Sequence, residues 1–205
     1  MHPNPAFRAE TRDRALALVR DRGFGTLAVN AEGGPLLSHV PLLLAEDGAS
    51  ADLHLVRSNP IARLGETAAV IAVMGPDAYV SPDWYEVPDQ VPTWNYAAVH
   101  LRGTLRPLPA DAMHDMLDRQ SAAYEARLLP KRPWTTAKMD PDVLARMMRQ
   151  ILPFRLEVEA VDATFKASQN KPDEVRLRAA DAVGAHRIGQ EAALMRALMR
   201  GAGPE

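Results

Sequence analysis

The chain has 205 residues, 47% of them hydrophobic and 24% charged, which suits one globular domain or one domain with a helical appendage. Its formal net charge of -2 provides no basic excess for phosphate contacts, so the composition does not support direct DNA binding. The absence of cysteine excludes disulfides, thiolate zinc sites and cysteine nucleophiles. Residues 1–10 lack the pattern of a secretory signal and no apolar stretch is long enough to span a bilayer, so we expect a cytoplasmic protein without membrane segments.

The predicted elements begin with a helix and continue as short strands. Apolar residues at helical spacing predict a helix over residues 8–22, and Gly23 fits its C-terminal stop. The pattern then changes to that of strands, which we expect over 24–30, 36–44 and 52–57 with turns between them.

A short helix and a further strand are expected next. Asn59 suits the N-cap and Pro60 the first position of a short helix that continues to Arg63. The Ala- and Val-rich residues 67–74 predict a buried strand. Residues 75–93 are rich in Pro, Trp and Tyr and show no clean period, which is typical of a packed or functional loop.

The remaining chain alternates between strands and helices. An alternating pattern predicts a strand over 96–105, and helices are expected over about 111–127 and 141–151. Residues 154–165 predict a last strand, and residues 173–200 are expected to be helical.

This order of elements predicts an antiparallel sheet closed into a barrel, in a mainly β protein of the α+β class with flanking helices and a C-terminal helical segment. We expect a barrel domain over residues 1–170, with a helical insert at about 109–151. Residues 171–205 are expected to form a C-terminal helical extension packed on the barrel.

Polar residues crowd into several otherwise apolar segments, and such a cluster often meets a polar ligand. The phosphate of a flavin mononucleotide needs a guanidinium, small hydroxyls and backbone donors, which Arg57, Ser58, Asn59 and Arg63 could supply. The ribityl chain needs polar side chains, and the flavin ring needs one flat apolar surface with hydrogen-bond donors along its pyrimidine edge. A positive charge from Lys166 beside that edge would favour the reduced, anionic flavin. The candidate cofactor-binding residues are Ser38, His39, Val40, His54, Arg57, Ser58, Asn59, Arg63, Trp94, Asn95, Lys166, Ser168 and Gln169.

Each of these residues also has a purely structural explanation. Arg57 could form a surface ion pair, Ser38 and His39 a half-exposed strand face, and Trp94 part of a core or interface. The residues alone therefore permit FMN without selecting it over other phosphorylated cofactors. The sequence contains no HExxH, GxGxxG, P-loop or GxSxG motif, so we expect no metal site and assign no catalytic residue.

Three segments resemble the PaiB family, whose members are also called FMN-binding negative transcriptional regulators. They are Tyr-Val-Ser-Pro-Asp-Trp-Tyr at 79–85, Val-Pro-Thr-Trp-Asn-Tyr at 91–96 and Phe-Lys-Ala-Ser-Gln-Asn at 165–170. The resemblance implies a split β-barrel like that of the pyridoxamine-phosphate oxidases, FMN as cofactor, and a homodimer with FMN between its subunits. Two positions depart from the family pattern: Ser58 stands where alanine is expected, and Ala167 where leucine is expected. Arg57 matches the pattern, and the departures leave the affinity for FMN open.

Four hypotheses about function follow. The first is a dimeric FMN-binding transcriptional regulator, although the sequence contains no convincing helix-turn-helix. The second is an FMN-dependent reductase or oxidase, in which the flavin does the chemistry. The third is a haem-binding split barrel with a histidine as axial ligand, and the fourth is a barrel without cofactor that serves as an interaction module. The sequence leaves the substrate, any target promoter and any protein partner undetermined.

Overall fold

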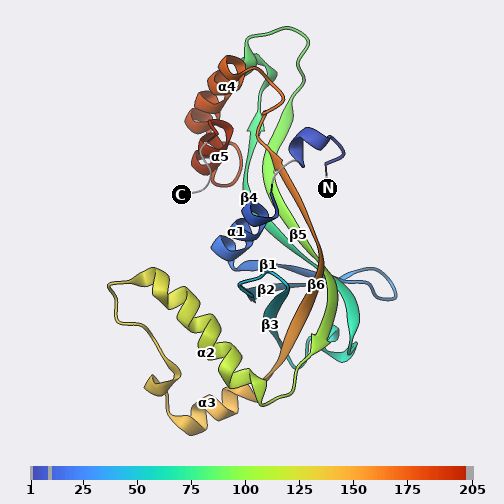
Figure 1. Cartoon of the computed structure of the whole chain (residues 1–205), viewed down its shortest axis with the longest axis vertical. Helices are drawn as coiled ribbons and strands as arrows, with labels where there is room; N and C mark the ends of the chain where they lie inside the picture. Colours follow the sequence, from blue (N-terminus) through green and yellow to red (C-terminus); the bar gives the residue numbers. More distant parts are fainter. Residues whose placement is uncertain (1, 9–10, 202–205) are drawn as a thin grey trace. The chain divides into compact units, whose positions relative to one another are not determined.

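The structure is a computed structural model that describes residues 2–8 and 11–201. Its six strands form a closed antiparallel barrel in the order β1-β2-β3-β6-β5-β4 (Figure 1). The predicted α+β class and the antiparallel barrel are therefore confirmed. No helix in the described part of the chain is long and apolar enough to cross a membrane.

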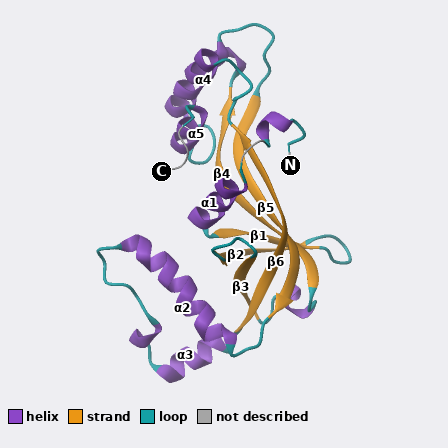
Figure 2. Cartoon of the chain, in the orientation of Figure 1, coloured by secondary structure: helices purple, strands orange, loops and turns teal. Residues whose placement is uncertain are grey.

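Figure 2 distinguishes the helices from the strands. The strands are β1 (Phe24–Val29), β2 (Leu36–Leu44), β3 (Ser50–Val56), β4 (Thr67–Val80), β5 (Thr93–Pro107) and β6 (Ile151–Lys166). The α-helices are α1 (Arg12–Arg22), α2 (Ala112–Glu125), α3 (Pro141–Met148), α4 (Asp173–His186) and α5 (Ala192–Met199). Short 3-10 helices are η1 (Pro5–Phe7), η2 (Pro60–Arg63), η3 (Pro82–Tyr85), η4 (Ala126–Leu128) and η5 (Thr136–Lys138).

The chain divides into two compact units that are each discontinuous in sequence. Unit 1 contains residues 1–18, 73–100 and 162–205, and unit 2 contains residues 19–72 and 101–161. Each of β4, β5 and β6 begins in one unit and ends in the other. The division into domains at residue 170 stays a prediction.

In unit 2, the strands pair in a register that places alternate side chains in the core. β1 pairs with β2 from Phe24↔Pro41 to Val29↔Leu36, and β3 pairs with β6 over its whole length. Fully buried side chains come from β1, β2, β3 and β6 and include Leu27, Leu42, Leu53, Phe154 and Leu156. Burying these side chains supplies the main driving force for folding of this unit.

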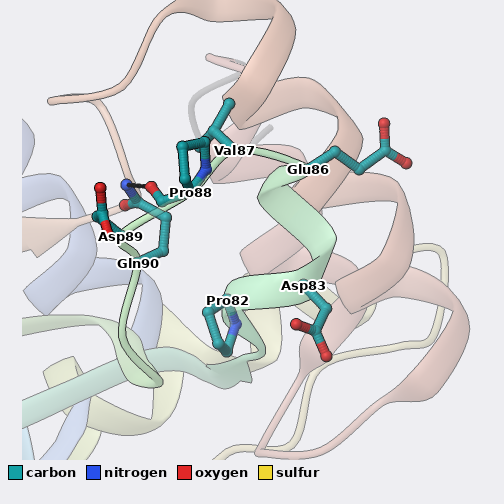
Figure 3. Close-up of a pocket in the computed structure, with 7 residues that line it drawn as sticks. All are labelled: Pro82, Asp83, Glu86, Val87, Pro88, Asp89 and Gln90. Carbon is teal, nitrogen blue, oxygen red and sulfur yellow. Dashed lines mark hydrogen bonds between the residues drawn. The ribbon is translucent and has the colours of Figure 1, made fainter.

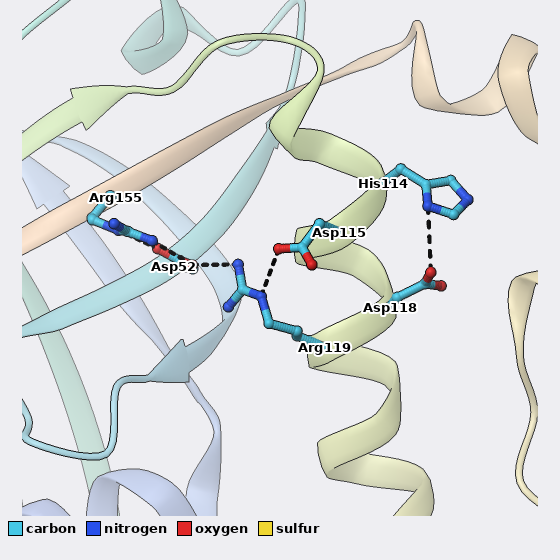
Figure 4. A network of polar contacts seen from close by, with 6 residues as sticks. All are labelled: Asp52, His114, Asp115, Asp118, Arg119 and Arg155. Atoms are coloured by element: carbon cyan, nitrogen blue, oxygen red, sulfur yellow. Dashed lines mark hydrogen bonds and ion pairs between the residues drawn. The ribbon is translucent and has the colours of Figure 1, made fainter.

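A buried carboxylate connects helix α2 to the wall of strands in unit 2 (Figure 4). Asp52 on β3 is only 4% exposed, and it accepts hydrogen bonds from Arg155 Nε at 2.6 Å and from an Arg119 terminal nitrogen at 2.9 Å. Arg119 lies on α2 and also donates to Asp115 one turn earlier. Burial would raise the pKa of Asp52, but the hydrogen bonds and charges of the two arginines outweigh it, so the pKa lies below its ordinary value.

In unit 1, the C-terminal segment is two helices rather than one continuous helical stretch. The prediction of helix over 173–200 is wrong between α4 and α5, where Arg187 and Glu191 have left-handed φ values of 55° and 57°. The carbonyls of Ile188 and Gln190 in this break accept hydrogen bonds from the backbone of β4. Pairing with a strand distant in sequence therefore overrides the local helical tendency.

Two further predictions need correction. The helix expected from residue 8 begins at Arg12 in the described chain, and residues 9 and 10 lie outside the described residues. The strand expected to be buried over 67–74 alternates instead, with Met74 exposed, and it continues to Val80. Gly75 and Pro76 are buried in succession, which interrupts the alternation and hides the second half of the strand from a periodicity search.

Candidate functional site

The candidate residues divide between the two units. Those on β2, β3, η2 and the turn that joins β3 to η2 lie in unit 2, and we call them the β2–η2 cluster: Ser38, His39, Val40, His54, Arg57, Ser58, Asn59 and Arg63. The remaining candidates lie in unit 1: Trp94, Asn95, Lys166, Ser168 and Gln169.

Asn59 organises the β2–η2 cluster. Its side-chain oxygen accepts a hydrogen bond from Ile61 N at 2.9 Å and caps η2, which confirms the predicted cap and the predicted short helix. Its side-chain nitrogen donates to Ser38 Oγ on β2 at 3.1 Å. On the same strand, His39 Nδ1 lies 3.0 Å from Thr26 Oγ1 of β1. The cap thus holds the start of η2 beside the polar part of β2.

Two arginines of the cluster are available to an anion. Arg57 and Arg63 are exposed, and neither forms an ion pair with a carboxylate among residues 2–8 and 11–201. Arg57 Nε donates to the carbonyl of Arg149 at 3.0 Å, which orients the guanidinium and leaves its two terminal nitrogens to other acceptors. Ser58, also exposed, adds a hydroxyl next to Arg57 in the sequence. The explanation of Arg57 as half of a surface ion pair is therefore not supported.

His54 and Val40 contribute to the cluster in different ways. The Nδ1 atom of His54 is buried and has no hydrogen-bond partner in the described chain. Burial also lowers the pKa of this imidazole and so favours its neutral form. Val40 is 2% exposed and belongs to the core, so only its backbone could contact a ligand. With two guanidiniums that lack a carboxylate partner and the hydroxyl groups of Ser38 and Ser58, the cluster fits a phosphorylated ligand.

In unit 1, three of the five candidates line a pocket with a volume of about 350 Å³, which we call the unit-1 pocket. They are Asn95, Lys166 and Ser168. Trp94 and Gln169 are not among its lining residues. Trp94 is 48% exposed and its ring lies 6.2 Å from that of Tyr79, whereas Gln169 Oε1 accepts from the backbone of Ala167 at 2.7 Å.

A buried hydrogen-bond network forms the floor of the unit-1 pocket. Ser168, with a left-handed φ of 60°, accepts a hydrogen bond from Asn95 Nδ2 at 2.9 Å, and its Oγ lies 2.7 Å from the hydroxyl of Tyr85. Burial raises the pKa of Tyr85, partly offset by its bond to Ser168. Asn95 is 0% exposed, yet its Oδ1 atom has no hydrogen-bond partner in the described chain.

Two lysines stand in the wall of the unit-1 pocket. Lys166 Nζ donates to the hydroxyl of Thr93, and Lys171 Nζ donates to the side-chain oxygen of Gln90. Burial lowers the pKa of Lys166. Tyr85 and Lys171 were not predicted as site residues. Tyr85 ends one of the segments that carry the family resemblance, which is the signal that could have identified it.

A second hollow of unit 1 lies at η3 and the loop that follows it (Figure 3). It has a volume of about 490 Å³, and its charged lining residues are Asp83, Glu86 and Asp89. The side chain of Gln90 folds back and donates to the carbonyl of Pro88 at 3.0 Å. Because its charges are all acidic, this hollow does not fit a phosphate.

The chain is similar to flavin-binding proteins in both sequence and fold. Residues 1–160 match the family described as "Putative FMN-binding domain". "Protease synthase and sporulation protein PAI 2" from Bacillus subtilis is 31% identical over 169 residues, which cover 80% of each chain. The uncharacterized protein YKL070W from Saccharomyces cerevisiae is 34% identical over 82 residues, or 36% of this chain and 48% of that protein.

Two solved structures show the same fold at low sequence identity. The FAD and heme binding protein from Mycobacterium smegmatis superposes with a TM-score of 0.56 and 17% identity, covering 88% of this chain and 80% of that one. The conserved hypothetical protein Rv2991 from Mycobacterium tuberculosis superposes with a TM-score of 0.55 and 14% identity, covering 82% and 92%. With the sequence matches, they confirm the PaiB resemblance and the split-barrel fold. The chain therefore belongs to the family of FMN-binding domains and is an FMN-binding split barrel.

Proposed function

We propose that this chain works as a homodimeric regulator of transcription and that its β2–η2 cluster holds the phosphate of FMN. The similarity to PAI 2, named as a protease synthase and sporulation protein, supports a regulatory role. Because the net charge of -2 provides little attraction for a phosphate backbone, we expect regulation through a protein partner or through the redox state of the flavin. Bound FMN supplies one- and two-electron redox chemistry.

The unpaired guanidiniums of Arg57 and Arg63 are the observation that carries the cofactor assignment. Two positive charges without carboxylate partners suit a phosphate dianion, and charge-assisted hydrogen bonds are about twice as strong as neutral ones. Ser58 would add a hydroxyl donor to the phosphate. Ser38, held beside η2 by Asn59, would meet a hydroxyl group of the ribityl chain. Contacts of Trp94 and Gln169 with FMN stay a prediction.

Exposed apolar side chains in both units support a homodimer. Leu37 in unit 2 is 62% exposed and Val91 in unit 1 is 73% exposed. Trp94, close in sequence to Val91, is 48% exposed. A second chain that covered these side chains would remove their apolar surface from water.

An FMN-dependent oxidoreductase is the second candidate function, because the unit-1 pocket is large enough for a small substrate. Its described residues do not assign an acid or a base to such a reaction. Rapid bleaching of bound flavin by a reduced nicotinamide would favour this function over regulation.

The experiment that tests the proposal is reconstitution of the full chain with FMN, followed by desalting and measurement of the visible flavin absorption. We expect the wild-type protein to retain flavin and Arg57→Ala to lose it, with an affinity about 10- to 100-fold lower, the usual effect of removing a charge-assisted hydrogen bond. Arg106→Ala is the matched control, because Arg106 is an exposed arginine of the same unit that pairs with Glu66 at 3.4 Å.

Light scattering on the same wild-type sample is expected to give the mass of two chains. Equal retention of flavin by Arg57→Ala and wild type would overturn the assignment of the phosphate site. A wild-type protein that retains no flavin would overturn the cofactor role of the cluster altogether.

A further inference from the structure

We propose that the unit-1 pocket is a second ligand site, separate from the FMN site, which binds a small organic anion bearing a carboxylate and a hydrogen-bond donor. The inference does not depend on the proposed regulatory function or on the phosphate site. It changes the assignment of Asn95, Lys166 and Ser168, which the sequence pattern had attributed to FMN.

The charges of the pocket wall favour a carboxylate. Lys166 and Lys171 are both half-buried, and the hydrogen-bond partners of their ammonium groups, Thr93 and Gln90, are neutral. Neither lysine forms an ion pair with a carboxylate within residues 2–8 and 11–201. Asp89 also lines the pocket, but it is exposed to solvent. Two partly desolvated ammonium groups without a counter-ion gain more from an anion than surface lysines do.

The Oδ1 atom of Asn95, a residue that lines the pocket, could accept a hydrogen bond from a ligand. Its Nδ2 atom is already used by Ser168, whereas Oδ1 is buried without a partner. Leaving a buried acceptor unsatisfied costs about 1–3 kcal/mol. Ser168 cannot move to satisfy it, because its hydroxyl is held between Asn95 and Tyr85. A hydroxyl or amine of the ligand would complete this network.

The size and walls of the pocket suit a ligand built on a single ring. Its volume of about 350 Å³ lies near the lower end of the usual range for small-molecule sites, about 300–1,000 Å³. Phe7 and Tyr85 line the pocket with almost fully buried rings, and Lys166 Nζ and Lys171 Nζ lie 5.9 Å and 5.4 Å from the respective ring centres. Its lining residues include no arginine, in contrast to the β2–η2 cluster. Hydroxybenzoates combine the ring, the carboxylate and the donor in one molecule.

The test is a calorimetric titration of the FMN-free full chain with benzoate, phenol and the three hydroxybenzoate isomers. At least one hydroxybenzoate is expected to bind more tightly than both benzoate, which lacks the donor, and phenol, which lacks the carboxylate. Lys166→Met and Lys171→Met are each expected to weaken that binding about tenfold, the usual contribution of a charge-assisted hydrogen bond. Asn95→Leu is expected to remove the preference over benzoate.

Lys138→Met is the matched control, since Lys138 lies in unit 2 and donates to the carbonyl of Pro133. Circular dichroism checks that each variant is folded, and the two lysine variants, which alter half-buried side chains, remain informative if Asn95→Leu unfolds. The proposal is overturned if no isomer binds or if both lysine variants bind as tightly as wild type.

Displacement of the bound hydroxybenzoate by saturating FMN would also overturn it, because the pocket would then belong to the flavin site. Because the titration uses FMN-free protein, a failure of FMN to bind would contradict only the proposed function and leave this result standing.

Discussion

Asp52 in unit 2 and Asn95 in unit 1 are both buried polar side chains, but the two units use them differently. Asp52 is satisfied by two arginines and lies outside the β2–η2 cluster. Asn95 is bonded to Ser168 and lines the unit-1 pocket itself. In unit 2, the buried carboxylate that stabilises the fold is therefore distinct from the arginines offered to a ligand, whereas in unit 1 Asn95 has both roles.

This difference has a consequence for mutagenesis. Ligand binding and stability should separate cleanly in unit 2, because Arg57 and Arg63 are exposed and Asp52 is not part of their cluster. In unit 1, a change that weakens binding is expected to weaken the fold as well, because buried polar networks are costly when partly satisfied.

The largest effect is expected for Asp52→Asn. This change leaves Arg155 and Arg119 facing an amide instead of a carboxylate, and we expect the free energy of unfolding to fall by about 2–3 kcal/mol. The loss should be smaller than for a fully buried pair, because the side chains of Arg119 and Arg155 are partly exposed. Urea unfolding measures it, with the exposed Asp111→Asn as control. FMN retention should be unchanged in the folded variant.

The difference in unfolding free energy between wild type and Asp52→Asn is expected to depend on pH. Because the pKa of Asp52 is lowered in the folded state, its contribution to stability is fully present above the unfolded pKa, about 4. It is lost as the pH falls through the folded pKa. The difference in unfolding free energy between wild type and Asp52→Asn should therefore narrow below about pH 4. A constant difference down to acid pH would show that the carboxylate charge is not what stabilises this contact.

A smaller effect is expected in unit 1 for Asn95→Ala, about 2 kcal/mol, since the change removes one partner of Ser168 and leaves a void. Ser168→Ala should cost about 1 kcal/mol, and the double variant should cost less than the sum, with a coupling of about 1 kcal/mol. A double-mutant cycle by urea unfolding measures this coupling. Additive losses would mean that the network is not a unit and that the contrast with unit 2 is weaker than the structure indicates.

The smallest effect is expected for Arg57→Ala, whose unfolding free energy should stay within about 0.5 kcal/mol of wild type. Arg57 is exposed and its side chain donates only to the carbonyl of Arg149 among the described contacts. Thermal unfolding without FMN provides the measurement, beside Arg106→Ala. A large loss of stability would show that this arginine holds the fold together and that its effect on flavin is indirect.

Elements with local signals could be predicted closely from the sequence. Strand β2 and the short helix η2 have the predicted limits, because a run of strand-forming residues and the pair Asn59-Pro60 act within a few residues. The second half of β4 and the break between α4 and α5 could not be predicted. Gly75 of β4 packs closely against Ala97, and the break is held by the backbone of the same strand, so both depend on contacts distant in sequence.

The candidate site shows the same limit. The polar residue types of the β2–η2 cluster and the unit-1 pocket could be recognised as unusual in apolar strands. Their separation into two sets depends on strand pairing and could not be inferred from spacing. Tyr85 joins the network through its hydroxyl contact with Ser168, and the turn at Ser168 precedes Lys171 in the pocket wall; both depend on contacts that spacing does not reveal.

Gly103 of β5 shows how closely two strands of unit 2 approach each other. A β-carbon at this position would lie 1.8 Å from the carbonyl oxygen of Glu157 on β6, far inside any tolerated contact between backbone and side chain. Natural relatives should therefore keep glycine at this alignment column, or change it only together with an insertion or deletion near Glu157. The column is thus an evolutionary marker for strand register, which distinguishes homologues that keep this arrangement of β5 and β6 from those that have altered it.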